Sequence, residues 1–148
     1  ADEASNEITH STKCMEDAIL VASKVQGCED EIPIKIRPKW TPPPSLEGRS
    51  CVYILAVPIR DDHSSNERHH FYVGETDSFL QRLSQHRRKK ASKFDWSLAS
   101  AAVFQIPGGK SDARLVESLV IRQLAQHGFD MISVADGMKL RPNTSSSQ

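Results

Sequence analysis

The chain has 148 residues, enough for one domain with a buried core, and its 19 Lys and Arg residues balance its 19 Asp and Glu residues. Net charge therefore indicates no class of partner, and no apolar run approaches the length that crosses a membrane, so we expect no membrane association. Three cysteines at unmatched spacings (Cys14, Cys28 and Cys51) argue against a disulfide framework or a zinc site and suit a reducing compartment.

The N-terminal third holds one helical pattern and one proline-rich stretch. Apolar residues recur at helical spacing between Ile8 and Val25, so we expect residues 1–28 to be the helical tail of a preceding region. They contain neither a signal peptide nor an arginine-rich targeting sequence, and we expect the chain to be the C-terminal part of a longer protein. Residues 29–49 contain five prolines and are interpreted as a semi-rigid linker, whose Trp40 docks on the domain or on a partner.

Two strands are predicted next. Residues 50–57 form an apolar run in which Tyr53 is the one polar-tipped side chain. The polar residues 59–69 predict a surface loop, which leads into a second, antiparallel strand around Phe71. We expect this strand to break at Gly74, because glycine tolerates the backbone conformations of a tight turn.

The helix that follows carries two cationic or proton-carrying groups on one face. We expect it to begin after Thr76 or Asp77, because both are good N-cap residues. Arg82 and His86 stand four residues apart and therefore lie on the same face. The apolar arc beside them consists of Phe79, Leu80 and Leu83.

A block of one charge sign surrounds this helix. Residues 78–93 contain no acid and six bases, namely Arg82, Arg87, Arg88, Lys89, Lys90 and Lys93. Such a block is typical of a surface that binds a polyanion such as DNA. The alternative is a solvated helix end, where cations also complement the helix dipole.

A third strand and a long helix complete the predicted domain, followed by a tail at residues 135–148. Residues 100–106 are an apolar strand bounded by a Pro-Gly-Gly turn. Ser111 or Asp112 caps the helix, which stops at Gly128.

Glu117 is the unusual residue of this last helix. At 100° per residue it falls inside the apolar arc, which consists of Ala113, Leu115, Val116, Leu119, Val120 and Leu124, with Ile121 at its edge. A carboxylate that faces a core is costly unless it is paired, hydrogen-bonded or bound to a metal. The two alternatives are a salt bridge to an arginine such as Arg82 and ligation of a divalent metal ion.

The order and spacing of these residues resemble the GIY-YIG nuclease family. Val52-Tyr53 and Tyr72-Val73-Gly74 are similar to its two motifs, and Arg82, His86 and Glu117 follow in the family's order. The run FYVGETDSFLQRL and the Trp-Thr-Pro-Pro-Pro lead-in are similar to the C-terminal nuclease domain of plant organellar MutS homologues. The resemblance implies a small α/β fold over residues 50–134, with a three-stranded, mostly antiparallel sheet flanked by helices.

The resemblance also implies a role for each residue. Tyr53 acts as or assists the general base, Tyr72 positions the water or the phosphate, and Arg82 grips the scissile phosphate. His86 binds phosphate or shuttles a proton, and Glu117 holds one Mg²⁺ or Mn²⁺. Val52 and Gly74 serve the structure of the motifs. The basic block, including Arg82 and His86, contacts DNA phosphates.

Two positions depart from the family pattern. Cys51 stands where the first motif usually has glycine, which we expect to change packing only. Asp130 stands where the family commonly has an asparagine after the metal-ligand helix. Asp130 either supplies a second metal-seeking carboxylate or leaves the role of the asparagine unfilled.

The implied function is a metal-dependent endonuclease that hydrolyses a phosphodiester bond in mismatched, branched or displaced-loop DNA. Its partner is the upstream MutS portion of the parent chain, in a mismatch repair and recombination surveillance protein of mitochondria and plastids. One alternative is a structure-selective DNA-binding module with little or no cleavage activity. Another is a protein-interaction domain that uses the Trp40 segment.

Overall fold

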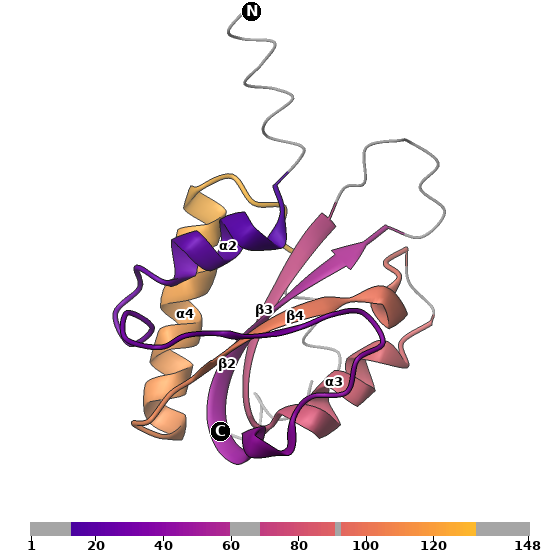
Figure 1. Cartoon of the computed structure of the whole chain (residues 1–148). Coiled ribbons are helices and arrows are strands. Elements are labelled where there is room, and N and C mark those ends of the chain that lie inside the picture. Colours follow the sequence, from indigo (N-terminus) through magenta and orange to yellow (C-terminus); the bar gives the residue numbers. More distant parts are fainter. Residues whose placement is uncertain (1–12, 60–68, 91–92, 133–148) are drawn as a thin grey trace, which may run out of the picture.

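The structure is a computed structural model that describes residues 13–59, 69–90 and 93–132. Its strands form one open sheet in the order β1-β4-β2-β3, and every neighbouring pair is antiparallel (Figure 1). The elements are α2 (Met15–Ala22), β1 (Ile34–Ile36), the short helix η1 (Pro44–Leu46), β2 (Glu47–Pro58), β3 (His69–Ser78), α3 (Phe79–Arg87), the short helix η2 (Trp96–Leu98), β4 (Ser100–Gln105) and α4 (Lys110–Gln126).

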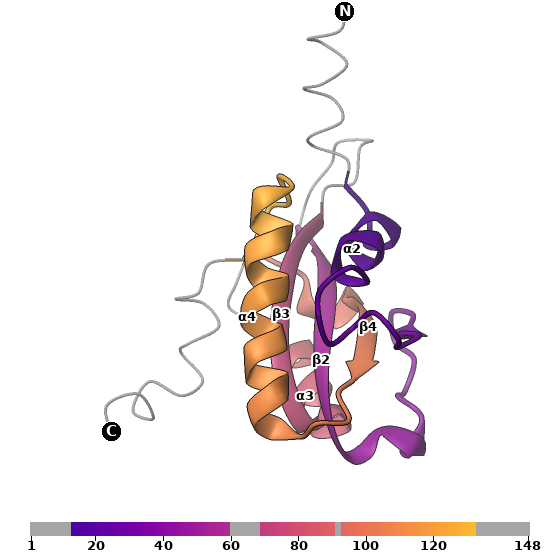
Figure 2. The ribbon, with the colours of Figure 1, turned by 90° about the vertical axis from the view of Figure 1, so that its left-hand side faces the viewer.

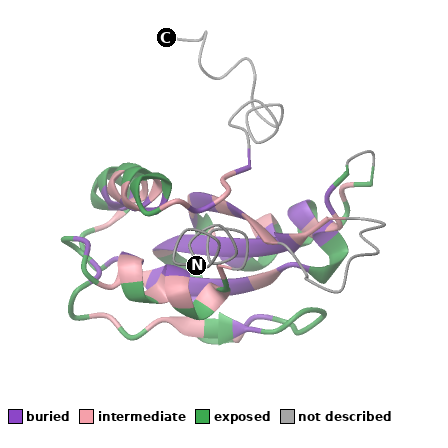
Figure 3. Cartoon of the chain, turned by 90° about the horizontal axis from the view of Figure 1, so that it is seen from above, coloured by how far each residue is buried: buried purple, intermediate pink, exposed green. Residues whose placement is uncertain are grey.

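The helices cover both faces of this sheet. Helices α2 and α4 lie on one face and α3 on the other, as Figures 1 and 2 show. Seen from above, the buried residues concentrate along the strands, and the exposed ones lie on the outer sides of the helices (Figure 3). Successive residues of a strand point to opposite faces, so the sheet separates two cores.

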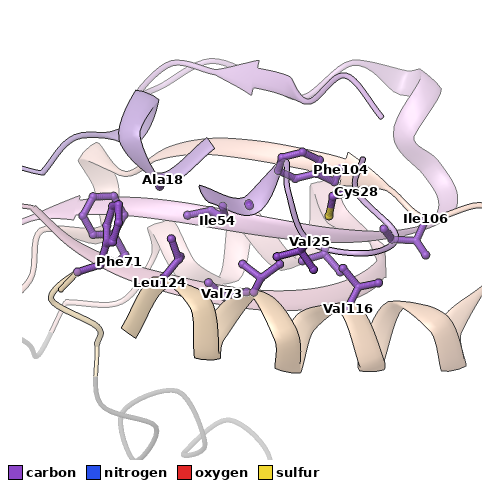
Figure 4. Packing of buried hydrophobic residues seen from close by; sticks show 14 of the residues in the cluster. Ala18, Val25, Cys28, Ile54, Phe71, Val73, Phe104, Ile106, Val116 and Leu124 are labelled. Carbon is purple, nitrogen blue, oxygen red and sulfur yellow. The ribbon is translucent and has the colours of Figure 1, made fainter. Parts of the chain in front are cut away.

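The α2/α4 face has an apolar core. Its strand residues include Ile54, Phe71, Val73 and Phe104, which pack against Ala18 of α2 and a row of small and branched residues of α4 (Figure 4). The α4 residues of this core are Ala113, Val116, Val120 and Leu124. The predicted arc on this helix was too wide, because Leu115 is 62% exposed.

The α3 face has a more aromatic core. Tyr53 and Leu55 of β2 pack there with Phe79 and Leu83 of α3 and with Trp96 of η2. The apolar arc predicted for α3 was also too wide, because Leu80 is an exposed residue. The two cores are therefore built from alternate residues of the same central strands.

The predicted antiparallel α/β fold is confirmed, but the sheet has four strands instead of three. The additional strand, β1, lies inside the stretch that we interpreted as a linker. Ile34 and Ile36 pair with Val103 and Ala101 of β4, and Ile36 is buried. A three-residue strand flanked by prolines carries too short an alternation to be recognised from sequence.

The N-terminal helix also joins the domain. Ala18 and Ala22 of α2 are fully buried in the same core as α4. The Asp17 carboxylate accepts a hydrogen bond from the Cys14 backbone N–H at 3.0 Å and so caps the start of the helix. The part of the predicted helix before residue 13, most of the predicted 59–69 loop and the predicted 135–148 tail lie outside the described residues.

The expected break at Gly74 is wrong. Strand β3 continues to Ser78, because Glu75 and Thr76 remain paired with Val52 and Cys51 of β2. Helix α3 therefore begins at Phe79, one to two residues later than predicted. The other predictions for regular elements agree with the structure to within a few residues, and α4 is followed by Gly128 in a left-handed conformation at φ 85°.

Candidate active site

Tyr53 lies at the centre of the α3 face, on the middle of β2. It pairs across the sheet with Gly74 of β3, and its side chain is fully buried. A Cβ atom placed on Gly74 would lie 2.5 Å from the Tyr53 Oη atom, so the phenol rests directly on the glycine backbone. Glycine is therefore needed at position 74 for close approach and not for a turn.

His86 of α3 contacts the tip of this phenol. Its Nε2 atom lies 3.0 Å from Tyr53 Oη, within hydrogen-bond distance, and its ring is fully buried. Burial, with the charges of Lys89 and Arg82, lowers the pKa of His86 from 6.5 to about 3. The imidazole is therefore neutral at pH 7 and able to accept a hydrogen bond from the Tyr53 hydroxyl, while none of the described residues forms a hydrogen bond with its Nδ1 atom.

Arg82 lies one turn before His86 and also reaches Tyr53. Burial raises the pKa of Tyr53 well above 10, the neighbouring Tyr72 adds to this effect, and the charge and hydrogen bond of Arg82 oppose it. Burial is the largest of these contributions, so Tyr53 keeps its proton at neutral pH. The spacing of four residues does bring Arg82 and His86 to one point, as predicted from the sequence.

Tyr72 and Trp96 complete the surroundings of the imidazole. The Tyr72 ring packs edge-on to His86 with centroids 4.9 Å apart, and the Trp96 ring stacks on His86 at 5.2 Å and 16°. Trp96 is buried and was not among our candidate residues. The sequence shows Trp96 only as a large aromatic residue after the basic block. No spacing rule for a helix or a strand connects it with a histidine ten residues earlier.

Glu117 belongs to α4, which covers the face of the sheet opposite to that of Tyr53 and His86. Lys110, Arg114 and Glu117 are spaced i, i+4 and i+7, so they form one stripe along α4. Lys110 Nζ and Arg114 Nε lie 3.0 Å and 3.7 Å from the Glu75 carboxylate on β3, which is an edge strand. Glu117 therefore lies on the stripe of α4 that faces this edge, and it is half-buried.

The position of Glu117 along the strand follows from the geometry of the elements. Helix α4 runs antiparallel to β3, because Lys110 lies beside Glu75 and Phe129, after the helix, packs on Phe71. Seven residues of helix advance about 10 Å, the length of about three strand residues. Glu117 is thus level with Tyr72, on the opposite face of the same edge strand.

A divalent ion at Glu117 would have few protein ligands. Among the described residues there is no group of three or more His, Cys, Asp and Glu side chains arranged to hold a metal. A single half-buried carboxylate fits Mg²⁺, which commonly keeps several waters and takes further oxygens from a substrate phosphate. Asp130 follows α4, and its backbone carbonyl accepts a hydrogen bond from the Phe71 N–H at 2.8 Å.

The basic block divides into inward and outward members. The Arg87 guanidinium donates to the carbonyl oxygens of Trp40 at 2.6 Å, Arg37 at 3.2 Å and Ala99 at 3.3 Å. These hydrogen bonds link the end of α3 to the segment after β1 and to the residue before β4. Lys89 lies 4.1 Å from the centroid of the Trp96 ring. The exposed members are Arg88, Lys90 and Lys93. Only part of the block is therefore presented to a large ligand.

Comparison with known proteins identifies one relative. Over 114 residues, 77% of the chain, the sequence is 32% identical to the DNA mismatch repair protein MSH1, mitochondrial, of Arabidopsis thaliana. The chain is distantly homologous to part of MSH1. The matched part is 9% of that protein's length. No protein-family model matches the chain, and no solved structure does. No helix within the described ranges combines the length and apolarity needed to cross a membrane.

Proposed function

We propose that the chain is a GIY-YIG-type, metal-dependent DNA endonuclease domain. Its substrate is mismatched, branched or displaced-loop DNA, and it works as part of a MutS-type mismatch repair and recombination surveillance protein of mitochondria and plastids. The similarity to part of MSH1 supports the repair context. The order of Tyr53, Tyr72, Arg82, His86 and Glu117 supports the reaction class.

The buried contact between Tyr53 and His86 is the observation that carries this proposal. Both side chains are fully buried, and burial drives their pKa values in opposite directions, so both are neutral. A polar pair in a core costs desolvation that an apolar pair would not. Titratable groups shifted so far from their ordinary range, with an arginine beside them, are typical of a catalytic site.

These neutral groups suit orientation of the attacking water, and neither of them takes up a charge. The Tyr53 hydroxyl donates its hydrogen bond to His86 Nε2, so the free lone pairs of Oη accept a hydrogen bond from the water and direct it at the phosphorus. Arg82 holds the scissile phosphate and the negative charge that builds on it. Glu117 would hold a Mg²⁺ or Mn²⁺ ion, which would supply Lewis-acid stabilisation of the negative charge on the phosphate.

The second candidate, a DNA-binding module with little cleavage activity, is favoured by a different observation. The Tyr53 side chain has no exposed surface, so in this conformation water does not reach its oxygen. Cleavage then requires a rearrangement around β3 or α3 when DNA and metal bind. A domain that lacks this rearrangement binds DNA and does not cut it.

An assay of the whole chain separates the two candidates. Linear, mismatched and displaced-loop DNA are incubated with Mg²⁺, with Mn²⁺ or with chelator, and cleavage and binding are measured separately. We expect Glu117→Gln to abolish metal-dependent cleavage and to leave binding in chelator unchanged. Glu16→Gln is the matched control, because Glu16 is an exposed carboxylate whose partner is the surface residue Lys35.

Three outcomes decide the matter. Cleavage by the unaltered chain and by Glu16→Gln, but not by Glu117→Gln, supports the nuclease. Binding of branched DNA without cleavage under any metal condition supports the binding module. Equal cleavage by the unaltered chain and Glu117→Gln contradicts the role that we assign to this carboxylate.

A further inference from the structure

The turn after β1 is held against α3. The Trp40 N–H donates to the Arg37 carbonyl at 3.0 Å, and Lys39 between them has a φ of 71°, so the chain reverses sharply here. Arg87 then donates to the carbonyl oxygens of both Arg37 and Trp40. The turn is therefore attached to the C-terminal end of α3, and Figure 1 shows the segment after β1 passing beside this helix.

The side chain of Trp40 points away from this anchored backbone. It is 53% exposed, whereas Trp96, the other tryptophan of the chain, is 1% exposed. The Arg37 guanidinium lies 5.1 Å from the centroid of the Trp40 ring, where it forms a cation–π contact. An indole held by its backbone and by one cation is a preformed aromatic surface.

The charged residues of the two segments that Arg87 joins have one sign. Arg37 and Lys39 are exposed in the turn, and Arg88 and Lys90 are exposed just beyond α3. Neither segment that forms this region, residues 32–46 and residues 78–93, contains an acidic residue. An exposed aromatic ring among cations complements a ligand with phosphates and flat rings, whereas a surface for an acidic peptide needs no such ring.

We propose that this surface, formed by Arg37, Lys39, Trp40, Arg88 and Lys90, binds a single-stranded DNA segment with one unpaired base stacked on Trp40. A base inside a duplex has both faces covered by its neighbours, so the indole selects unpaired DNA. The proposal rests on the proposed function, and it identifies the part of a branched or displaced-loop substrate that the chain holds outside the cleavage site. It also explains why Arg87 points inward, since its hydrogen bonds position this surface.

Fluorescence and binding measurements on the whole chain in chelator test this proposal. The probes are a blunt duplex and the same duplex with a single-stranded tail. We expect the tailed DNA to quench tryptophan emission, because the exposed Trp40 stacks on a base and Trp96 is shielded. Trp40→Ala is expected to weaken binding of the tailed DNA about tenfold, the loss of one stacked base, with little effect on the blunt duplex.

Two further variants make the result decisive. Trp40→Phe keeps an aromatic ring and should retain most of the affinity for the tail while losing the quenching. Leu115→Ala is the matched control, because Leu115 is similarly exposed but lies on α4, across the sheet. Equal affinities of Trp40→Ala and the unaltered chain for tailed DNA, equal losses on tailed and blunt DNA, or no quenching by the tail would each overturn the proposal.

Cleavage is scored separately in metal. If the tailed DNA quenches tryptophan emission but the chain cuts no DNA, the proposed nuclease activity is contradicted and the proposed single-stranded DNA surface is supported. If the chain cuts DNA but the tailed DNA does not quench tryptophan emission, the nuclease is supported and the proposed surface is overturned.

Discussion

The two faces of the sheet are built from the same strands and use burial differently. On the α2/α4 face, the core consists of apolar residues, among them Ile54, Phe71 and Phe104. On the α3 face, the core includes the fully buried His86 in contact with the Tyr53 hydroxyl. Burial therefore stabilises the α2/α4 face throughout. On the α3 face, the desolvation of Tyr53 and His86 offsets part of the stability gained by burial.

This difference follows from what each face buries. A buried imidazole loses its solvation, and its pKa falls because the charged form is disfavoured. The α2/α4 face holds Ala113, Val116 and Val120 of α4, which carry no titratable group, so we expect their substitution to change packing alone. The four predictions that follow test this comparison, and they are ordered from the largest expected effect to the smallest.

Acid should destabilise the α3 face through His86. The folded-state pKa of about 3 lies below the ordinary 6.5, so the unfolded chain takes up this proton first as the pH falls. The stability that depends on neutral His86 is complete above pH 6.5 and is lost as the pH falls toward 3, with a ceiling of roughly 5 kcal/mol. Urea unfolding of the unaltered chain and of His86→Gln across this window measures the effect. Parallel pH profiles for the two proteins would contradict it.

Truncation on the α2/α4 face should lower stability without any change in pH dependence. Phe104 is fully buried opposite Val52, and Phe104→Ala should cost about 3 to 5 kcal/mol in the free energy of unfolding. The same urea series should give a profile displaced downward and parallel to that of the unaltered chain. If the unfolding free energy of Phe104→Ala depended on pH differently from that of the unaltered chain in the range where His86 titrates, the two faces would be coupled.

Removal of the guanidinium at position 82 should act on catalysis. Arg82→Ala is expected to lose about 2 to 4 kcal/mol of transition-state stabilisation, seen as slower cleavage in Mg²⁺ or Mn²⁺. Arg82→Lys keeps the charge and loses the planar fork, so it should recover little activity. The kinetics are compared at equal fractions of DNA bound, and full activity of Arg82→Ala would remove this residue from the site.

The smallest expected effect tests the close approach of the two strands. Gly74→Ala places a methyl group against the Tyr53 phenol, with Oη at 2.5 Å and Cζ at 2.7 Å, and should cost about 1 to 3 kcal/mol of unfolding free energy. The penalty should be smaller in a Tyr53→Phe background, which removes the nearer atom. Thermal or urea unfolding of the four proteins measures this coupling. A neutral Gly74→Ala would show that the phenol moves aside easily.

Regular elements with strong local patterns were predictable from the sequence. The apolar run of β2, the strand β4 with its Pro-Gly-Gly end and the helix α4 were placed to within a few residues, because periodicity is a local property. Strand β1 was missed for the opposite reason. Three residues between prolines become a strand only because β4 offers them an unpaired edge.

The candidate site was partly predictable in the same sense. Residue order identified Tyr53, Arg82 and His86, and helical spacing placed the last two on one face. Trp96 was missed because its stacking on His86 is a contact between separate elements. The inward position of Arg87 was missed because a basic run does not reveal which of its members bind carbonyl oxygens.

The sequence alone determined the fold class, most of the strands and helices, and which residue types occur in the order of a nuclease motif. These features depend on neighbours within a turn of helix or a few strand residues. Only the tertiary structure decided that Tyr53 and His86 are neutral and in contact, and that Glu117 lies on the helix that covers the opposite face of the sheet. Burial and the distances between separate elements set pKa values and site geometry, and neither quantity exists until the chain has packed.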